Sequence, residues 1–371
     1  MPAVLLVLLH VYIGARLLSP FAWPAMAAGA VALAALASLM LLSASRGFGR
    51  RGHADVIDWA GLLAVGLFSS LFVLTLLRDA GLLLAEAAAL AGAPALPHGA
   101  TRASAMAVPL LALLASGWGY ANARRRPGIR RVEVPIAGLP PALQGCRIVQ
   151  ITDLHVGMTI KRPFVQAVVE AVNALDADVV VLTGDLVDGG VAQLREHVAP
   201  LASLRARGGV LAVTGNHEYY SGAQAWIAEL RRLGARVLMN EHVVLSRGGA
   251  AWVVAGVPDF GAHRFDPTHR ADPARALAGA PVGAPRILLA HQPRAAPEAE
   301  RAGVDLQLSG HTHGGQFMPW NWFVRLQQPY TAGLYRRGRM WVYVSRGTGY
   351  WGPPKRLGAP SEISLLELVA A

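Results

Sequence analysis

The stretch Ser309-Gly310-His311-Thr312-His313-Gly314-Gly315 follows a short apolar run, residues 306–308, and holds two imidazoles one residue apart. Glycines on both sides let the backbone turn tightly, so the two rings can face two different ions. A His-x-His sequence in a loop is also compatible with two ordinary polar loop residues. Its interpretation therefore depends on the rest of the chain.

Four segments upstream have a common design, in which a β-branched apolar strand runs into a loop of metal-ligand residue types. They are residues 148–151 before Asp153 and His155, 179–182 before Asp185 and Asp188, 210–213 before Asn216 and His217, and 287–290 before His291. In layered α/β folds, sites collect beyond the carboxyl ends of strands. We therefore expect the five loops to converge on one site.

These motifs resemble a known family. The series Asp153-x-His155, Gly184-Asp185-x-x-Asp188, Gly215-Asn216-His217-Glu218, His291 and Gly310-His311-x-His313 is similar, in order and in residue type, to the calcineurin-like metallophosphoesterase superfamily. The resemblance covers roughly residues 145–368. Gly314-Gly315-Gln316 and the segment 344–349 are similar to a bacterial, membrane-associated phosphodiesterase branch. The family's fold is an αββα sandwich.

The periodicity of the chain after Val132 agrees with that fold. Helical spacing is found in residues 163–175, 192–207 and 223–233, and strand patterns in residues 251–257, 340–344 and 363–368. We predict an α/β fold, with two sheets packed face to face and helices outside.

The resemblance implies two divalent metal ions and assigns their ligands. It implies that Asp153, His155, Asp185 and His313 hold the first ion, and that Asp185, Asn216, His291 and His311 hold the second. Asp185 is then the bridging carboxylate. Carboxylate, imidazole and amide-oxygen ligands without thiolate suit Mn, Fe or Zn, whereas calcium would need more oxygens. Two such ions bind phosphate oxygens and activate a bridging hydroxide that attacks phosphorus in line.

The same resemblance implies two catalytic residues beside the metal ligands. His217 follows the ligand Asn216 and is then free to protonate the leaving oxygen, and Asp188 resembles the family's partner that orients this imidazole. His217 as a metal ligand, or as an inert surface histidine, remains an alternative.

For several other residues near the predicted site, the sequence is compatible with both a functional and a structural role. Asp259 and His263 follow a strand end and suit either substrate contact or a turn, and Arg294 and Arg346 are candidate phosphate contacts. Aromatic residues are concentrated after the histidine loop. Trp320, Trp322, Tyr330, Tyr335, Tyr350 and Trp351 suit either a lid for an apolar substrate or ordinary core, and we favour core.

Charge and cysteine content exclude some classes of protein. The formal net charge is +11, but the Arg residues are spread along the chain after residue 121 without a clustered basic groove. We therefore do not expect nucleic acid as a partner. A single cysteine, Cys146, excludes an intramolecular disulfide, and its place in an apolar strand predicts a small buried side chain.

The first 121 residues differ in composition from the rest. They are rich in Ala, Leu, Val and Gly and form four apolar segments, residues 3–18, 21–42, 57–77 and 103–120. A membrane span needs about 20 apolar residues, so the last three qualify and the first is short. We predict a transmembrane domain of about four helices in residues 1–121, a basic linker and domain entry in 122–144, and the metallophosphoesterase domain in 145–371.

Loop charges predict the orientation of these helices. Arg46, Arg50 and Arg51 follow the second segment, and Arg124 to Arg126 begin a basic run after the fourth. In the loop between the third and fourth segments, Arg78 and Arg102 are expected to be offset by Asp79 and Glu86. By the positive-inside rule, the catalytic domain is cytoplasmic. The amino terminus is also cytoplasmic if the first segment spans, and outside if it does not.

These features predict a membrane-anchored, dinuclear-metal phosphoesterase of the bacterial inner (plasma) membrane. The expected reaction is hydrolysis of a phosphodiester or pyrophosphate, and the membrane helices extend this to a lipid-linked substrate. The branch includes enzymes that cleave nucleotide-diphosphate-linked acyl sugars, which makes this last step an analogy. Alternatives are a phosphomonoesterase or nucleotide phosphodiesterase with a purely localising anchor, a non-catalytic receptor or scaffold, and a nuclease. Membrane lipids are the other expected partner.

Overall fold

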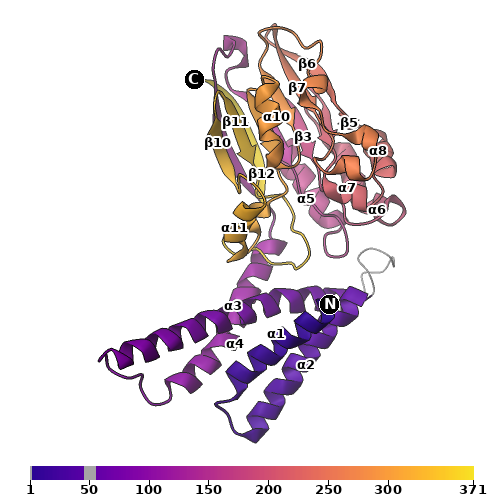
Figure 1. Ribbon diagram of the computed structural model, residues 1–371. Helices are drawn as coiled ribbons and strands as arrows, with labels where there is room; N and C mark the ends of the chain where they lie inside the picture. The colour runs from indigo at the N-terminus through magenta and orange to yellow at the C-terminus, as the bar shows by residue number, and fades with distance from the viewer. Residues whose placement is uncertain (1, 46–55) are drawn as a thin grey trace. The chain divides into compact units, whose positions relative to one another are not determined.

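The structure is a computed structural model that describes residues 2–45 and 56–371 (Figure 1). Contacts divide the chain into two units. The helical unit comprises Met1–Asn122 with Gly352–Lys355, and the sheet unit comprises Ala123–Trp351 with Arg356–Ala371. The basic loop that holds Arg46, Arg50 and Arg51 lies outside the described residues.

The described part of the helical unit contains the four expected helices. They are α1 (Pro2–Leu18), α2 (Trp23–Ser45), α3 (Val56–Leu90) and α4 (Ala100–Arg124). By length and composition, α2, α3 and α4 can each cross a membrane, whereas α1 is a shorter apolar helix of 17 residues. The four predicted helices are present in the described residues, but only three of them have the length and composition of a membrane span.

Helix α3 is longer than expected. The sequence suggested an end at Leu77, but α3 continues to Leu90. Arg78, Asp79 and Glu86 are therefore helical residues and do not belong to the loop before α4, as we had expected. The Asp79 carboxylate accepts hydrogen bonds from Tyr12 Oη at 2.7 Å, Arg16 Nε at 2.7 Å and Arg78 Nη1 at 3.0 Å. These partners satisfy the carboxylate inside the helical unit, and the Ala/Leu-rich sequence beyond it has high helix propensity.

Two six-stranded sheets form the sheet unit. Their orders are β1-β12-β2-β3-β4-β5 and β10-β11-β9-β8-β7-β6. The strands of the first sheet are β1 (Gly128–Ile136), β12 (Glu362–Ala370), β2 (Cys146–Ile151), β3 (Val179–Thr183), β4 (Val210–Val213) and β5 (Arg236–Val237). Those of the second are β10 (Gly333–Arg337), β11 (Met340–Val344), β9 (Leu306–Ser309), β8 (Arg286–Leu289), β7 (Ala250–Gly256) and β6 (Glu241–Arg247).

Buried side chains define four layers in this unit. One cluster joins the sheets face to face, with Ile148 and Val181 from the first and Ile287 and Leu308 from the second. A second cluster packs α5 (Arg162–Asn173), α6 (Val191–Val198) and α8 (Ala223–Arg232) on the first sheet. A third packs α9 (Pro273–Ala276) and α10 (Ala296–Arg301) on the second. The αββα architecture is confirmed.

Two details near the domain entry and the outer helices differ from expectation. Residues 122–144 were expected to be a basic linker and domain entry; in the structure α4 runs to Arg124, and β1 pairs in parallel with β12 from Gly128 to Ile136. The helix expected in residues 192–207 is the shorter α6, followed by a 3-10 turn at Ala199–Ser203 that begins next to Pro200. Cys146 in β2 is fully buried, as predicted.

Parallel pairing brings the predicted site loops to the same edge. Strands β2, β3 and β4 are parallel neighbours in the first sheet, and β8 and β9 are parallel neighbours in the second. Because the carboxyl ends of parallel strands meet at one edge, the loops after these five strands can approach one another across the two sheets.

Candidate metal centre

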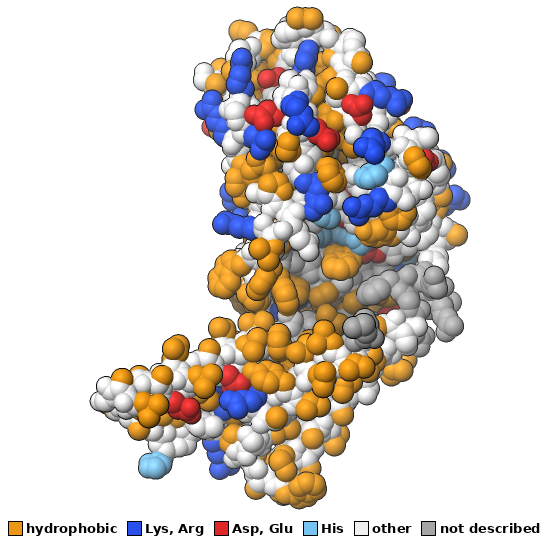
Figure 2. All heavy atoms as spheres, viewed as in Figure 1, with side chains coloured by type: hydrophobic (Ala, Val, Ile, Leu, Met, Phe, Trp, Pro, Cys, Tyr) orange, Lys and Arg blue, Asp and Glu red, His pale blue; other side chains and the backbone are white. Residues whose placement is uncertain are grey.

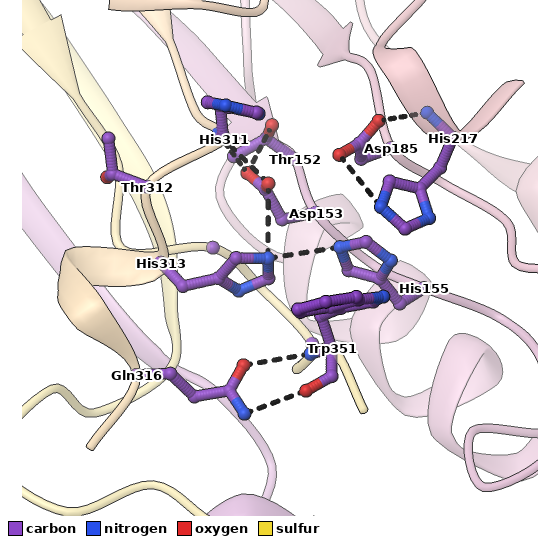
Figure 3. A network of polar contacts seen from close by, with 12 residues as sticks. Thr152, Asp153, His155, Asp185, His217, His311, Thr312, His313, Gln316 and Trp351 are labelled. Carbon is purple, nitrogen blue, oxygen red and sulfur yellow. Dashed lines mark hydrogen bonds and ion pairs between the residues drawn. The ribbon is translucent and has the colours of Figure 1, made fainter. Parts of the chain in front are cut away.

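The five loops bring six of the seven predicted metal ligands into two groups of donor atoms. Asp153, His155 and His313 form the first group, and Asp185, His291 and His311 form the second; within each group the ligand atoms lie within 4.8 Å of one another. Figure 3 shows the first group with Asp185, His217 and His311 around it. Each group takes residues from both sheets, so the site depends on how the sheets are packed.

The first group has its donor atoms turned toward one point. His155 Nε2 lies 3.0 Å from His313 Nε2, and His313 Nε2 lies 3.5 Å from Asp153 Oδ1. Both Asp153 carboxylate oxygens accept from the backbone N–H of His311, at 2.9 and 3.0 Å. The first aspartate loop is thereby fixed to the histidine loop.

The second group is built on Asp185. Its Oδ2 lies 3.0 Å from His291 Nε2, and its Oδ1 accepts from the backbone N–H of His217 at 2.8 Å. His311 Nδ1 lies 3.3 Å from His291 Nε2. The other ring nitrogen of His291 lies 2.8 Å from the Thr183 carbonyl oxygen, which fixes the ring with Nε2 toward Asp185.

Asn216 supplies a separate test of whether a metal fits here. Its Oδ1 is buried and has no hydrogen-bond partner among the described residues. A buried amide oxygen without a partner costs about 1–3 kcal/mol, and coordination by a cation would satisfy it. Two carboxylate–imidazole groups with this oxygen are a donor set that suits Mn, Fe or Zn, so the residues present fit the implied ions.

The ligand loops adopt an uncommon backbone conformation. Asp153, His155, Asp185, His311 and His313 all have positive φ, between 50° and 69°. Such non-glycine residues cost of order 1–3 kcal/mol each and persist where the surrounding structure determines them. Strain at five of the predicted ligands indicates that the positions of these side chains, rather than backbone stability, dictate the loop conformations.

Glycines next to the ligands leave no room for a side chain. A Cβ on Gly310 would fall on the Asp153 carboxylate and on Thr152 Oγ1, and one on Gly215 would fall on Asp185. The backbone of each glycine therefore lies directly against a carboxylate of the candidate site.

The protonation states of two histidines already suit metal binding. Burial, with the charge on His291, lowers the pKa of His311 to about 3. Burial, His155 and Arg356 hold the pKa of His313 well below its usual value. Burial disfavours the charged form of His291 too, but Asp185 outweighs it and raises the pKa to about 10. Two of the three rings are thus neutral, the form that donates a lone pair.

His217 lies beside both groups and is paired with Asp188. His217 Nδ1 lies 2.6 Å from Asp188 Oδ1, and the same oxygen lies 2.9 Å from His155 Nδ1. Burial opposes protonation of His217, but its hydrogen bond to Asp188 and the charge of Asp185 raise the pKa to about 9. Burial likewise opposes ionisation of Asp188, but the two histidines lower its pKa to about 2. These shifts favour a protonated His217 ring that is hydrogen-bonded to an ionised Asp188 carboxylate.

Two buried residues that sequence reasoning left without a role support the ligands. The Glu218 carboxylate accepts from the backbone N–H groups of Asp185, Leu186 and Gly215, and so ties two ligand loops together. Its position three residues after Gly215 is the capping-box position at the start of α7 (Asn216–Tyr220), which is the signal that could have identified it.

Arg356 supports the histidine loop from far along the chain. It is 1% exposed, and its Nη1 donates to the His313 and Arg346 carbonyl oxygens at 2.9 and 2.8 Å, while Nη2 lies 3.2 Å from His313 Nδ1. No sequence motif links it to His313, which is 43 residues upstream.

The other residues that the sequence suggested as substrate or phosphate contacts have different surroundings in the structure. Asp259 is buried and accepts from Gly261 N at 2.7 Å and Gln292 Nε2 at 2.9 Å, so it serves a turn. Arg294 donates to the Gln327 carbonyl oxygen at 2.7 Å, and Arg346 pairs with Glu362 at 3.0 Å. His263 lies in a 3-10 turn after β7, and none of the three candidate metal groups among the described residues includes it.

The aromatic concentration is divided between core and surface. Tyr350 is buried, as a core assignment predicts, and Tyr330 and Tyr335 are half-buried. Trp320, Trp322 and Trp351 are exposed, so the core assignment is wrong for them. The Trp351 ring lies 5.8 Å from that of His217, and Gln316 binds its backbone N–H and C=O at 2.9 and 2.8 Å (Figure 3).

Comparisons with known proteins match this chain to a family. A family model described as "Calcineurin-like phosphoesterase" matches residues 146–315. A Bos taurus protein named "Transmembrane protein with metallophosphoesterase domain" is 45% identical over 264 residues, which are 68% of this chain and 60% of that protein. The chain therefore spans about three fifths of this bovine relative.

The chain matches a larger share of two further relatives than of the bovine protein. A Danio rerio protein of the same name is 39% identical over 319 residues, 84% of this chain and 72% of that protein. That share exceeds the sheet unit, so the match includes part of the helical unit. An "Uncharacterized metallophosphoesterase" of Helicobacter pylori strain J99 is 39% identical over 265 residues, 70% of this chain and 69% of that protein.

Proposed function

The chain belongs to the calcineurin-like phosphoesterase family, and we propose that it is a membrane-anchored, dinuclear-metal hydrolase of a phosphodiester or pyrophosphate bond. The observation that carries this proposal is the pair of donor groups, Asp153–His155–His313 and Asp185–His291–His311, beside the buried and unpartnered Asn216 oxygen. A site for one structural ion would need only one such group.

In the proposed site, the first group with Asp185 would hold one ion, and the second group with Asn216 would hold the other. Mn, Fe and Zn are the candidates, and Mn is the one we would test first. When bound, such a pair of ions neutralises phosphate oxygens and supplies an activated water. Asp185 lies at the second group and accepts from the His217 N–H, and its bridging role is part of the proposal.

His217 is the proposed proton donor to the leaving oxygen. Its Nδ1 is held by Asp188, so Nε2 is the atom that is free to deliver a proton, and this atom lies 4.0 Å from Asp185 Oδ2. A raised pKa keeps the ring charged at neutral pH. Asp188 positions the ring and stabilises its charged form, as a carboxylate partner does in other acid–base pairs.

The surroundings of His217 support a substrate with an apolar leaving part. The rings of Tyr220 and Trp351 lie 5.2 and 5.8 Å from His217, and both side chains are exposed. A phosphomonoester with a small polar leaving group would gain little from such walls. We therefore propose a diester or pyrophosphate with a lipid-linked or nucleotide-sugar-lipid substituent, acted on at the cytoplasmic face of a bacterial inner membrane.

The test is hydrolysis by the full-length chain in detergent micelles or nanodiscs. A chromogenic phosphodiester and the matching monoester would be compared with added Mn²⁺ and with chelator. We expect metal-dependent hydrolysis with a preference for the diester. A preference for the monoester would favour the phosphomonoesterase alternative. No turnover with two ions bound per chain would contradict catalysis and favour a receptor or scaffold.

A further inference from the structure

We propose that an exposed aromatic surface on the sheet unit docks on the lipid bilayer. We call it the α11 surface. It consists of Met318, two residues before helix α11 (Trp320–Phe323), together with Trp320, Trp322 and Phe323 on α11 and Leu326 in the 3-10 turn Val324–Leu326.

The α11 surface exposes large apolar side chains in an otherwise well-packed unit. The exposed fractions are 50% for Met318, 66% for Trp322, 51% for Phe323 and 82% for Leu326. Figure 2 shows hydrophobic side chains gathered over this part of the sheet unit. Single exposed apolar residues are ordinary, but a contiguous group that includes several aromatic side chains marks an interaction site.

Contacts inside the sheet unit connect this surface to the end of α4. Met318 follows Phe317 and Gln316, and Gln316 binds the backbone of Trp351 through both amide atoms. The neighbouring residue, Tyr350, accepts a hydrogen bond at its hydroxyl from Arg124 Nη1 at 3.2 Å. The α11 surface and the last residue of α4 are therefore linked by a short chain of contacts.

Helix α4 is one of the three described helices that are long and apolar enough to cross a membrane, and its last two residues belong to the sheet unit. Ala123 in its last turn is fully buried in the core of the sheet unit, and Arg124 Nη1 also donates to the Thr159 carbonyl oxygen at 2.8 Å. Only residues 125–127 separate α4 from β1. Arg124 and Tyr350 therefore mark the part of the sheet unit that is joined in sequence to a helix able to cross a membrane.

The chemistry of the α11 surface suits a bilayer more than a protein partner. Trp is enriched at the membrane–water interface because its ring is amphipathic, and Trp, Phe and Leu form the face that interfacial helices bury at the boundary of headgroups and acyl chains. Arg325 is exposed within the surface, and Arg125 and Arg126 are exposed at the end of α4, so cationic groups flank the apolar ones. This combination is complementary to anionic lipid headgroups.

Docking would place the metal centre beside the lipid surface. Gln316, two residues before Met318, binds the backbone of Trp351, and the Trp351 ring lies 5.8 Å from that of His217. A lipid-linked phosphodiester could then reach the site while its hydrocarbon part stays in the bilayer. This last consequence rests on the proposed function, whereas the docking itself does not.

The experiment uses the full-length chain in nanodiscs of phosphatidylcholine with phosphatidylglycerol. A single environment-sensitive fluorophore is attached to Trp322→Cys, and Cys146 stays unlabelled because it is fully buried. The matched control is Val282→Cys, which is 97% exposed and lies before the amino end of β8, away from its metal-ligand end. We expect spin-labelled lipid to quench the probe at position 322 at least about twofold more than the probe at 282, and aqueous iodide to do the reverse.

Two outcomes would overturn docking. The probe at position 322 could be quenched by iodide as strongly as the control, which would mean that the surface faces water. It could also be protected from both quenchers, which would mean that protein, such as a second copy of the chain, covers the surface. Leu326→Cys, at 82% exposure, repeats the measurement if Trp322→Cys does not fold. An inactive but folded chain that still docks would separate failure of the proposed function from failure of this inference.

Discussion

The metal centre and the α11 surface are neighbours in the sequence and opposite in physical character. The histidine loop ends at Gly315, and the first residue of the α11 surface is Met318. The metal centre buries carboxylates and imidazoles on strained backbone, whereas the α11 surface exposes large apolar side chains on a regular helical turn. Polar side chains usually lie at the surface and large apolar side chains usually lie in the core, and each of these two regions reverses that pattern.

The comparison separates two ways in which a chain gives up stability for function. A buried polar group costs free energy unless its partners are in place, so the metal centre should be sensitive to single atoms. An exposed apolar side chain contributes little to folding, so the α11 surface should tolerate substitution when no membrane is present. The predictions below test this contrast, from the largest expected effect to the smallest.

Replacing Asp185 by Asn should have the largest effect. The amide cannot supply the anionic oxygen that lies 3.0 Å from His291 Nε2, so the second group loses its charge and the proposed bridge. We expect turnover of the phosphodiester to fall at least about 10,000-fold, with fewer than two ions bound per chain. Asp176→Asn is the control, since this carboxylate lies at the surface beside Arg207. Equal losses in both variants would contradict the assignment.

Replacing His217 by Ala should reduce turnover while leaving metal content unchanged. The ring is paired with Asp188 and shares a third group of donor atoms with Asp188 and the predicted ligand His155, but His217 itself is not one of the seven predicted ligands. Its loss should therefore remove a proton donor and no predicted ligand. We expect kcat to fall about 100- to 1,000-fold, measured with elemental analysis of the same sample. His197→Ala on the outer helix α6 is the matched control. Loss of an ion from His217→Ala would instead support the ligand alternative.

Replacing Arg356 by Lys tests whether a distant residue positions a ligand. A lysine cannot reproduce the guanidinium contacts to two carbonyl oxygens and to the His313 ring. We expect metal affinity to fall about 10- to 100-fold, as measured by metal titration. Arg301→Lys, at an exposed position at the end of α10, should leave the affinity unchanged. Unaltered affinity in Arg356→Lys would show that the histidine loop holds itself in place.

Adding one methyl group at Gly310 should disturb the first group. The new Cβ would fall on the Asp153 carboxylate, and relieving this overlap should cost about 1–3 kcal/mol of folding free energy and weaken metal binding. Gly190→Ala is the matched control, because a Cβ there meets no atom within 4 Å. Thermal unfolding with and without metal measures both effects, and a Gly310→Ala chain as stable as the control would contradict the close approach of the loops.

The smallest effect should come from the α11 surface. Because the Trp322 side chain is 66% exposed, Trp322→Ser should change the free energy of unfolding in detergent by no more than about 0.5 kcal/mol. Hydrolysis of a water-soluble diester should also stay within about twofold of wild type. Chemical denaturation and a turnover assay in detergent check this. A loss of stability above about 2 kcal/mol would mean that Trp322 is packed as core, and the contrast with the metal centre would fail.

The sequence predicts much of the candidate metal centre because the predicted ligands follow apolar strands at fixed offsets. Asp153, Asp185 and His291 could each be read as residues at a strand end, and parallel pairing brings such ends together. Arg356 could not be found in this way, since its contact with His313 depends on the path of the chain after β11. Glu218 was visible in the motif, but its role required the three backbone N–H groups that it accepts from.

Composition was less informative about exposure and helix length. Trp322 and Tyr350 belong to one aromatic cluster in the sequence, but only Tyr350 is buried, because burial depends on the elements that cover a residue and not on its type. The charged pair Arg78–Asp79 suggested the end of a helix. Asp79 instead finds partners on α1, and such tertiary contacts override the local pattern.

The central claim is that two ions, held by two groups of this chain's residues, are required for phosphoester hydrolysis. The most direct measurement is a titration of the metal-free, full-length chain with Mn²⁺, in which bound ions per chain and turnover of the phosphodiester are recorded together. The account predicts that turnover rises with occupancy and reaches its maximum at two ions per chain. Full activity in the presence of chelator, or no activity with both ions bound, would contradict it.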